Sequence, residues 1–355
     1  MPARRHRRSG GDEVTSPLLE LPDAVPPPDG SPDAGVAWHH GEPLREQRAA
    51  ERDVVVIDRS HREVLAVPGE DRLAWLHTLT SQHLSELGEG EHTEALVLNL
   101  QGRVEHHAVV SNVGGTVWLD TETGRAAGLL GYLQQMVFWS QVQPRDATDE
   151  IAVLSLLGPS VGQLLAQTDI PGIVRSREAA TDLLVPRSQL VDIWQKLVTA
   201  GATPAGTWAY EALRAAALRP RLGVDTDERT IPHEVGWIGP AVHLDKGCYR
   251  GQETVARVSN LGKPPRRMVL LHLTSPDDLP ETGAEVRSAE RVVGRVGTVA
   301  THHELGPIAL ALLKRSVDPA TTLTVGDYAA SIDPDSVPAD TGEPPGRASL
   351  RRLKA

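Results

Sequence analysis

The densest group of reactive side chains lies in residues 246–253, which read Lys-Gly-Cys-Tyr-Arg-Gly-Gln-Glu. Cys248 is the only cysteine of the chain, and Lys246 and Arg250 flank it. Nearby cations favour the thiolate, which is the nucleophilic form of a cysteine side chain. The spacing therefore predicts a reactive thiol, and the alternative is a buried structural cysteine in a glycine-rich turn.

The glycines and polar side chains around this thiol favour a binding loop. Gly247 and Gly251 permit backbone conformations that other residues resist, and they let a ligand or a second backbone segment approach closely. Gln252 and Glu253 supply hydrogen-bond donors and acceptors that suit a flat heteroaromatic amide. Residues 254–258 read Thr-Val-Ala-Arg-Val, and this β-branched pattern predicts that a strand starts there.

Residues 246–253 and the Val-Ala-Arg that follows resemble the signature of the YgfZ family of folate-binding proteins. That family is related to the T-protein, the aminomethyltransferase of the glycine cleavage system, and it includes factors that assist iron–sulfur cluster assembly and repair. The resemblance implies a pocket for tetrahydrofolate or a one-carbon derivative. It implies folate and iron–sulfur client enzymes, or their assembly machinery, as partners. It also implies that Cys248 is the functional thiol and that Lys246 tunes it.

The resemblance extends over about residues 53–332. Shorter matches to the T-protein superfamily lie at Val67 to Asp71, Leu79-Thr80, a spaced pattern from Leu184 to Arg214, Gly223-x-Asp225 and Pro232-x-Glu234. The resemblance implies three sub-domains around a central folate pocket. Cofactor-binding roles are implied for Asn99, Arg103, Glu234, Gln252 and Glu253.

Two parts of the T-protein pattern are missing. Where the T-protein carries paired aspartates, one of them treated as catalytic, this chain has Glu105, His106 and His107. Where the T-protein continues Arg-x-Glu-x-Gly, residues 214–218 read Arg-Ala-Ala-Ala-Leu. The missing aspartates argue against aminomethyl transfer and leave open whether the chain is an enzyme.

Three functions follow from these residues. We expect a tetrahydrofolate-binding accessory protein that supports the assembly or repair of iron–sulfur enzymes. The alternative is a folate-dependent one-carbon (aminomethyl) transferase, in which Glu105 or His106 would act near the folate nitrogens. A third hypothesis is a cysteine-nucleophile enzyme without folate, in which His243 or His233 would serve as the base.

Two carboxylates that precede the signature have two interpretations. Asp225 and Glu234 could fix their loop by accepting hydrogen bonds from backbone N–H groups. A carboxylate also matches the guanidine-like edge of a pterin, because two parallel charge-assisted hydrogen bonds form. The sequence leaves both interpretations open.

Composition narrows the class of protein. The chain has 355 residues and a formal net charge of −11, which argues against a general nucleic-acid-binding surface. It contains no run of about 18 apolar residues, and the arginine-rich residues 4–8 are not followed by the apolar segment of a signal peptide. We therefore expect a cytoplasmic protein without a membrane span.

The metal-ligating residue types predict no metal site. One cysteine excludes an internal disulfide and a [4Fe–4S] cluster held by four cysteines of one chain. The histidine pairs at 39–40, 106–107 and 302–303 are poor metal sites, because adjacent residues on a strand point to opposite faces.

The hydrophobic pattern predicts an α+β fold followed by a small antiparallel β-barrel. We expect a disordered tail over residues 1–48, a folate-binding region over 49–262, the barrel over 263–332 and a second disordered tail over 333–355. Strands are predicted over 53–58, 63–69, 94–99, 104–110, 115–120, 151–157, 268–273, 285–287, 292–299, 308–313 and 328–332. Helices are predicted over 70–79, 124–138, 158–167, 189–200 and 207–218, the last with Thr207 as its N-cap.

Overall fold

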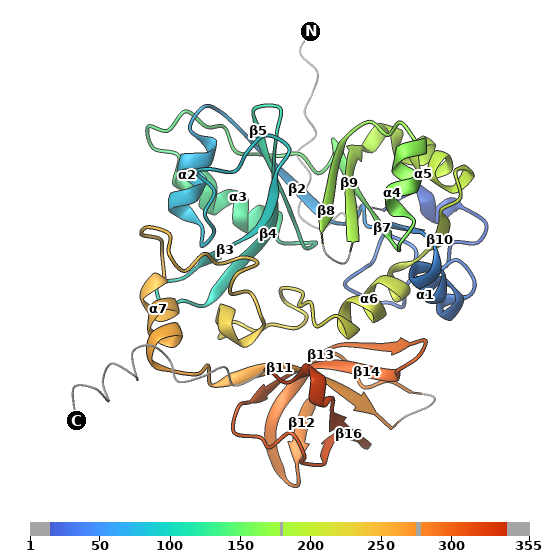
Figure 1. The fold of residues 1–355 in the computed structure, drawn as a ribbon, viewed down its shortest axis with the longest axis vertical. Coiled ribbons are helices and arrows are strands. Elements are labelled where there is room, and N and C mark those ends of the chain that lie inside the picture. Colours follow the sequence, from blue (N-terminus) through green and yellow to red (C-terminus); the bar gives the residue numbers. More distant parts are fainter. Residues whose placement is uncertain (1–14, 178–179, 275–277, 339–355) are drawn as a thin grey trace.

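The structure, a computed structural model, describes residues 15–177, 180–274 and 278–338. Two five-stranded sheets lie side by side, and a closed barrel lies below them in the view of Figure 1. The predicted α+β fold with a small antiparallel barrel is confirmed. Within the described ranges, no helix combines the length and the apolar character that crossing a bilayer requires.

The first sheet is antiparallel, with the strand order β3 (His92–Leu98), β4 (Val104–Val113), β5 (Thr116–Thr121), β2 (Glu63–Pro68) and β6 (Arg145–Asp146). One face packs against α2 (Arg72–Leu79) and α3 (Ala126–Gln135). Strand β2 is buried on both faces, because Leu65 and Val67 lie in the core with these helices while Val64 and Ala66 contact the second sheet. The two-sided burial explains its uninterrupted apolar sequence.

The second sheet has the strand order β10 (Thr203–Ala205), β1 (Val55–Asp58), β7 (Ile151–Leu157), β9 (Ala180–Pro186) and β8 (Ile173–Arg177). Helices α4 (Val161–Gln167) and α5 (Leu190–Thr199) share a core with it that includes the buried Trp194. Strands β8 and β9 were not among the predicted strands. Asp182 and Arg175 interrupt their apolar pattern, and both side chains are buried by pairing with each other.

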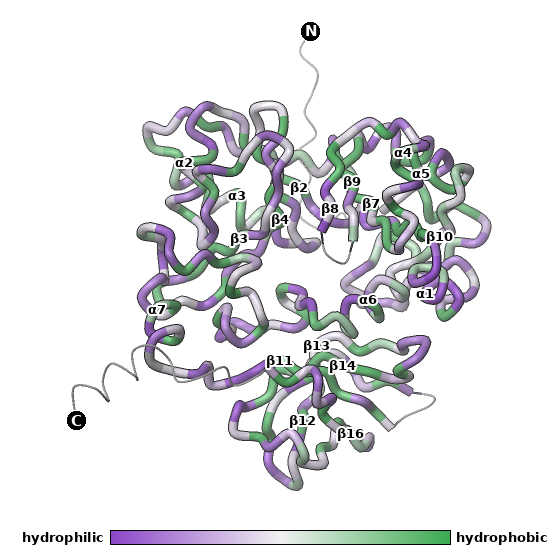
Figure 2. Tube along the Cα trace, in the orientation of Figure 1, coloured by the Kyte–Doolittle hydropathy of each residue, from purple (hydrophilic) through white to green (hydrophobic). Residues whose placement is uncertain are grey.

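The barrel closes in the order β11 (Arg266–Leu273), β14 (Gly306–Lys314), β13 (Arg291–His302), β12 (Glu285–Ser288), β15 (Leu323–Val325) and β16 (Tyr328–Ile332). Hydrophobic and hydrophilic stretches alternate along its strands (Figure 2). Helix α6 (Thr207–Ala216) joins the barrel to the sheets, because Ala212 and Ala215 share a core with Met268 and Leu310. This packing fixes the segment that follows α6 between the barrel and the sheets.

Two local predictions are wrong. Residues 254–258 do not start a strand but lie in α7 (Gln252–Leu261), where the buried Val255 packs into the core shared with the barrel. Gly251 turns the chain into this helix with a φ of +84°, a conformation that favours glycine. The N-cap of α6 is Gly206 rather than Thr207, whose hydroxyl instead donates to the carbonyl oxygen of Ala37 at 3.3 Å.

The structure differs from the predicted tail over residues 15–48. This segment contains η1 (Pro17–Glu20) and the start of α1 (Pro43–Arg52), and Leu18 joins the core of the second sheet. Its proline-rich composition resembles a linker, but Leu18, Val36 and Ala37 are buried. Residues 333–338 include η4 (Pro334–Ser336), whereas residues 1–14 and 339–355 of the predicted tails lie outside the described residues.

A substitution in the N-terminal segment tests its packing. We expect Leu18→Ala to lower the free energy of unfolding by about 2–4 kcal/mol, because it leaves a cavity in a packed core. The matched control is Val25→Ala in the same segment, since the Val25 side chain is 38% exposed and should cost little. Urea denaturation measures both. Equal effects of the two substitutions would contradict the packing described here.

Candidate functional site

A cavity of about 260 Å³ lies where the two sheets meet the segment that follows α6. Its lining is rich in cations and aromatic groups and holds only two carboxylates among the described residues. The basic residues are Arg59, Arg62, Arg177, Arg214, Arg219 and Arg221; the acidic ones are Glu94 and Glu122; the rings belong to His107, Tyr210 and Trp237. A cavity with this lining can hold a flat ligand that carries negative charge.

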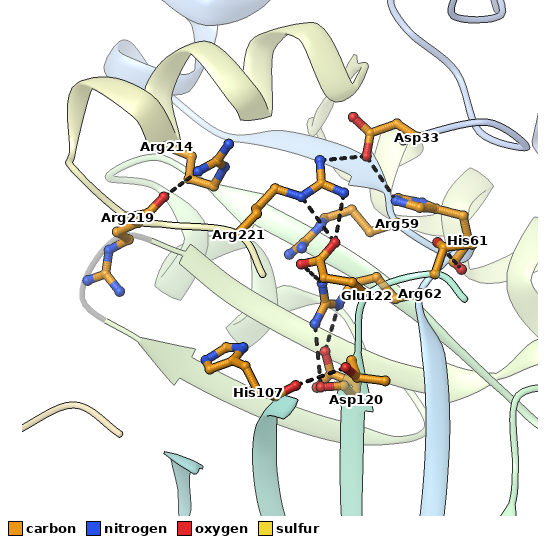
Figure 3. A network of polar contacts seen from close by, with 12 residues as sticks. Asp33, Arg59, His61, Arg62, His107, Asp120, Glu122, Arg214, Arg219 and Arg221 are labelled. Atoms are coloured by element: carbon orange, nitrogen blue, oxygen red, sulfur yellow. Dashed lines mark hydrogen bonds and ion pairs between the residues drawn. The ribbon is translucent and has the colours of Figure 1, made fainter. Parts of the chain in front are cut away.

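Glu122 stands at the centre of a buried ion-pair network (Figure 3). Its carboxylate accepts from Arg62 at 2.7 Å and from Arg221 at 2.7 and 3.0 Å. Arg221 also donates to Asp33 at 2.8 Å, and Arg62 donates to Asp120 at 2.7 Å. Burial alone would raise the pKa of Glu122, but Arg221 and Arg62 hold that pKa well below its usual value. The group is therefore a carboxylate at neutral pH.

Glu94 anchors a second network on the first sheet. Its carboxylate accepts from Arg177 at 3.1 Å and pairs with His107 Nε2 at 2.9 Å. Burial opposes its charge, yet His107 and Arg177 lower the pKa of Glu94 to about 2. Arg177 also donates to Asp182 at 2.8 Å, which links β8 and β9 to the first sheet.

The ring of His107 stacks on the indole of Trp237. The two ring centroids lie 5.0 Å apart and the planes differ by 11°. The imidazole is held on one edge by Glu94, so the pair presents a fixed aromatic group at the cavity wall. A stacked pair of this kind offers a surface on which a flat heteroaromatic ligand can pack.

Strand alternation separates the two adjacent histidines of β4. His107 faces the cavity, whereas His106 points to the face that packs under α3, with its ring close to Gly128. Burial, together with Arg125 and Arg250, lowers the pKa of His106 to about 4, so it is neutral at physiological pH. Glu105 lies outside the cavity and pairs with Arg250 at 3.2 Å. Neither predicted acid–base group therefore lines the cavity.

Lys246 and Cys248 lie in the signature loop, outside the cavity lining. The Lys246 ammonium donates to the carbonyl oxygens of His77 and Thr80 at the end of α2, and it lies 4.9 Å from the centre of the Tyr249 ring. Burial lowers the pKa of Lys246 to about 8. The Cys248 thiol is exposed. Lys246 therefore ties the loop to α2, while the thiol faces solvent.

Two of the other predicted residues, Asn99 and Gln252, stabilise the loop region. The side-chain oxygen of Asn99 accepts from the backbone N–H groups of Gln101 at 2.9 Å and Arg103 at 3.0 Å, which closes the β3–β4 turn. Gln252 accepts from the Tyr249 N–H at 3.1 Å. Arg103 and Glu253 are exposed.

The hairpin turn packs closely against the signature loop. A Cβ atom at Gly102 would lie 2.6 Å from the Thr254 side chain, and one at Gly251 would lie 2.4 Å from the carbonyl oxygen of Asn99. Both glycines also have positive φ angles, of +73° and +84°. Gly251 of the signature and Gly102 of the hairpin therefore allow close contact between two chain segments.

Asp225 and Glu234 both make the structural contacts that one interpretation requires. Asp225 accepts from the backbone N–H groups of Arg221 and Thr298, each at 2.7 Å. Glu234 accepts from the Ile231 N–H at 3.1 Å and pairs with Arg266 at 2.8 Å. Neither residue is among those that line the cavity.

Sequence reasoning missed nearly all of the cavity. Of its charged residues, only Arg214 belongs to a motif singled out in the sequence. Charged residues inside or directly after apolar strands could have indicated the cavity. Arg59 and Arg62 follow β1, and Glu122 follows β5. Such residues are ordinarily exposed, so their burial becomes evident only when their partners from other strands are known.

One group of metal-ligating atoms occurs among the described residues. The ligand atoms of Glu51, His302 and His303 lie within 4.8 Å of one another. The two imidazole rings stack at 4.7 Å instead of pointing apart, because β13 ends at His302. His302 Nδ1 already accepts from the backbone N–H groups of Glu304 and Leu305. These contacts occupy Nδ1, one of the two nitrogens through which His302 could bind a metal ion.

The ion pairs of Glu94 predict a pH-dependent stability. Because its pKa falls from 4.5 unfolded to about 2 folded, its contribution is complete above pH 4.5 and is lost as the pH falls toward 2. We expect Glu94→Gln to lower the free energy of unfolding by roughly 3 kcal/mol at pH 7, since it leaves Arg177 only Asp182, a carboxylate that Arg175 shares.

Urea denaturation of both proteins between pH 3 and 7 measures this difference, which should shrink below about pH 4.5. Glu86→Gln is the control, because the Glu86 side chain is 86% exposed. A difference that stays constant down to pH 3 would contradict the assignment.

Several known proteins resemble this chain in sequence. Residues 5–171 match the model of the GCVT N-terminal domain. The Arabidopsis thaliana protein named "Putative transferase At1g60990, chloroplastic" is 25% identical over 318 residues, which cover 80% of this chain and 71% of that protein. An aminomethyltransferase of Nostoc sp. (strain PCC 7120) is 28% identical, with 75% of this chain and 78% of that protein covered.

A solved structure shows the same architecture. The glycine cleavage system aminomethyltransferase T from Bartonella henselae superposes with a TM-score of 0.76 at 17% identity, covering 88% of this chain and 93% of that one. The resemblance inferred from the sequence is thus supported at the level of the T-protein superfamily. The chain has the fold of the glycine cleavage T-protein, and the two relatives above are named as an aminomethyltransferase and a putative transferase.

Proposed function

We propose that the central cavity binds tetrahydrofolate or a one-carbon derivative of it. The observation that carries the proposal is the stacked pair of His107 and Trp237 in a cation-rich cavity. The aromatic pair suits the flat pterin, and the arginines suit the carboxylates of the glutamate tail. Similarity to proteins named aminomethyltransferase supports the same ligand.

The cavity favours binding of folate over aminomethyl transfer. Both carboxylates of its lining are engaged, Glu122 by Arg62 and Arg221, and Glu94 by Arg177 and His107. A carboxylate that pairs with arginine and accepts further hydrogen bonds is a weak proton acceptor, because these contacts stabilise its charged form. When bound, the folate would supply a carrier for one-carbon groups, and the residues of this chain would position it.

We also propose that the protein supports the assembly or repair of iron–sulfur enzymes through Cys248. The thiol is exposed, so a client protein can reach it. Lys246 and Arg250 flank it in sequence. Lys246 donates to a carbonyl oxygen at the end of α2, and Arg250 pairs with Glu105. The loop therefore presents the thiol on a fixed support that is separate from the cavity lining.

Calorimetric titration with tetrahydrofolate tests the folate site. We expect saturable binding, and a Kd raised roughly three- to tenfold in Trp237→Leu, because the variant removes the stacked ring. Trp139→Leu is the matched control, since Trp139 is 92% exposed. Cys248→Ala should bind as the unaltered protein does. No heat of binding up to millimolar ligand would refute the folate proposal.

The thiol proposal needs a test in cells. In a host that lacks this gene, we expect lowered activities of [4Fe–4S] enzymes, restored by the unaltered chain but not by Cys248→Ala. Asp245→Ala changes an exposed residue of the same loop and should restore activity, which controls for disturbance of the loop. Full restoration by Cys248→Ala would dismiss a role for the thiol.

Turnover distinguishes the one-carbon transferase alternative. Purified protein that transferred a methylene or aminomethyl group at a rate abolished by Glu94→Gln would support an enzyme. Stoichiometric binding without turnover supports the accessory role.

A further inference from the structure

Arg59 is a cavity arginine whose charge is poorly balanced by its surroundings. It directly follows β1, its side chain is 8% exposed, and it lines the cavity. Its guanidinium carbon lies 4.0 Å from the centre of the Tyr210 ring. Its hydrogen bond within the described part of the chain runs from Nη1 to Ser155 Oγ at 3.3 Å. A guanidinium has five N–H donors, so most of its capacity is unused there.

The carboxylate nearest to Arg59 is already engaged elsewhere. Asp182 Oδ1 lies 3.8 Å from Arg59 Nη1, which is beyond hydrogen-bond distance. The same carboxylate accepts from Ser155 at 2.6 Å, Arg175 at 2.9 Å and Arg177 at 2.8 Å. Its negative charge is therefore divided among three groups before Arg59 is counted.

Four other arginines of the lining differ in this respect. Arg62, Arg177, Arg214 and Arg221 each form ion pairs with at least two carboxylates. Burial lowers the pKa of Arg59, whereas at Arg62 and Arg221 burial is outweighed by carboxylates that raise the pKa. The lowered pKa of Arg59 agrees with the geometry, because Arg59 has fewer carboxylate partners than these four arginines.

A buried cation with few partners is unfavourable, and an anion placed beside it removes part of that cost. The Arg59 guanidinium lies over the Tyr210 ring, so N–H donors at its edge beyond the one bonded to Ser155 remain available. Two parallel N–H donors at such an edge can bind a carboxylate. Arg59 therefore combines burial, cavity exposure and unused donors directed by a fixed plane.

We propose that Arg59 binds an anionic group of the cavity's ligand and that, for tetrahydrofolate, this group is a carboxylate of the glutamate tail. The second part rests on the proposed folate function, and the first part does not. The proposal makes Arg59 a specificity residue for ligands that carry a carboxylate.

The test compares Arg59→Met and Arg59→Lys with the unaltered chain, using tetrahydrofolate and 6-methyltetrahydropterin, which carries no carboxylate. We expect Arg59→Met to weaken tetrahydrofolate binding roughly 10- to 100-fold, with Arg59→Lys in between. The methylpterin should bind the unaltered chain more weakly than tetrahydrofolate does and should be insensitive to either substitution. Arg48→Met, which changes an exposed arginine of α1, is the matched control.

Stability separates recognition from a structural role. Because Arg59 is poorly compensated, Arg59→Met should leave the melting temperature of the ligand-free protein unchanged or raised, while the increase caused by ligand is lost. Equal tetrahydrofolate affinities for Arg59→Met and the unaltered chain would overturn the proposal, and so would a lowered ligand-free melting temperature with normal affinity.

A small dicarboxylate distinguishes failure of this proposal from failure of the folate function. Glutarate should raise the melting temperature of the unaltered chain and not that of Arg59→Met. If tetrahydrofolate does not bind but glutarate does so through Arg59, the folate function fails and the anion site stands. If tetrahydrofolate binds and Arg59→Met has no effect with either probe, the anion site fails and the folate function stands.

Discussion

Buried arginine–carboxylate pairs fix how the parts of this molecule meet. Arg175 of β8 pairs with Asp120 of β5, so the second sheet is joined to the first by charge at the edge of the cavity. Arg221, beyond α6, reaches Glu122 of the first sheet and Asp33 of the N-terminal segment. Breaking a buried pair leaves an uncompensated charge that costs about 3–5 kcal/mol. The pairs therefore favour one relative position of the sheets, α6 and the N-terminal segment.

This arrangement also explains why charged groups line part of the central cavity. Val64 and Ala66 of the first sheet pack against Val153 of the second. Beyond this apolar contact, charged side chains contribute to the lining of the cavity. The signature loop belongs to a different part of the molecule, where Lys246 binds the end of α2 and the thiol is exposed. Folate recognition and thiol chemistry, as proposed, thus have separate structural supports.

The sequence predicted those parts whose pattern is local. Strands such as β7 and β14 are long apolar runs, and the barrel followed from short strands between glycines and prolines. The prediction of a strand was wrong at α7. Thr254, Val255 and Val258 have high β propensity, but the packing of Val255 overrides it. Sequence reasoning failed at the cavity because ion pairing across strands has no local pattern. Arg175 and Asp182 bury each other only once β8 and β9 are paired.

The contact between Gly102 and Gly251 has a consequence for the tolerance of the signature to mutation. A side chain at either position would collide with the opposing segment, and the left-handed backbone would add strain. Substitution at Gly251 would therefore separate the loop from the β3–β4 turn, and this effect does not depend on any role of the thiol. Retention of this glycine in a natural or laboratory variant reports on the space between two chain segments, whereas retention of Cys248 would report on the proposed role of the thiol.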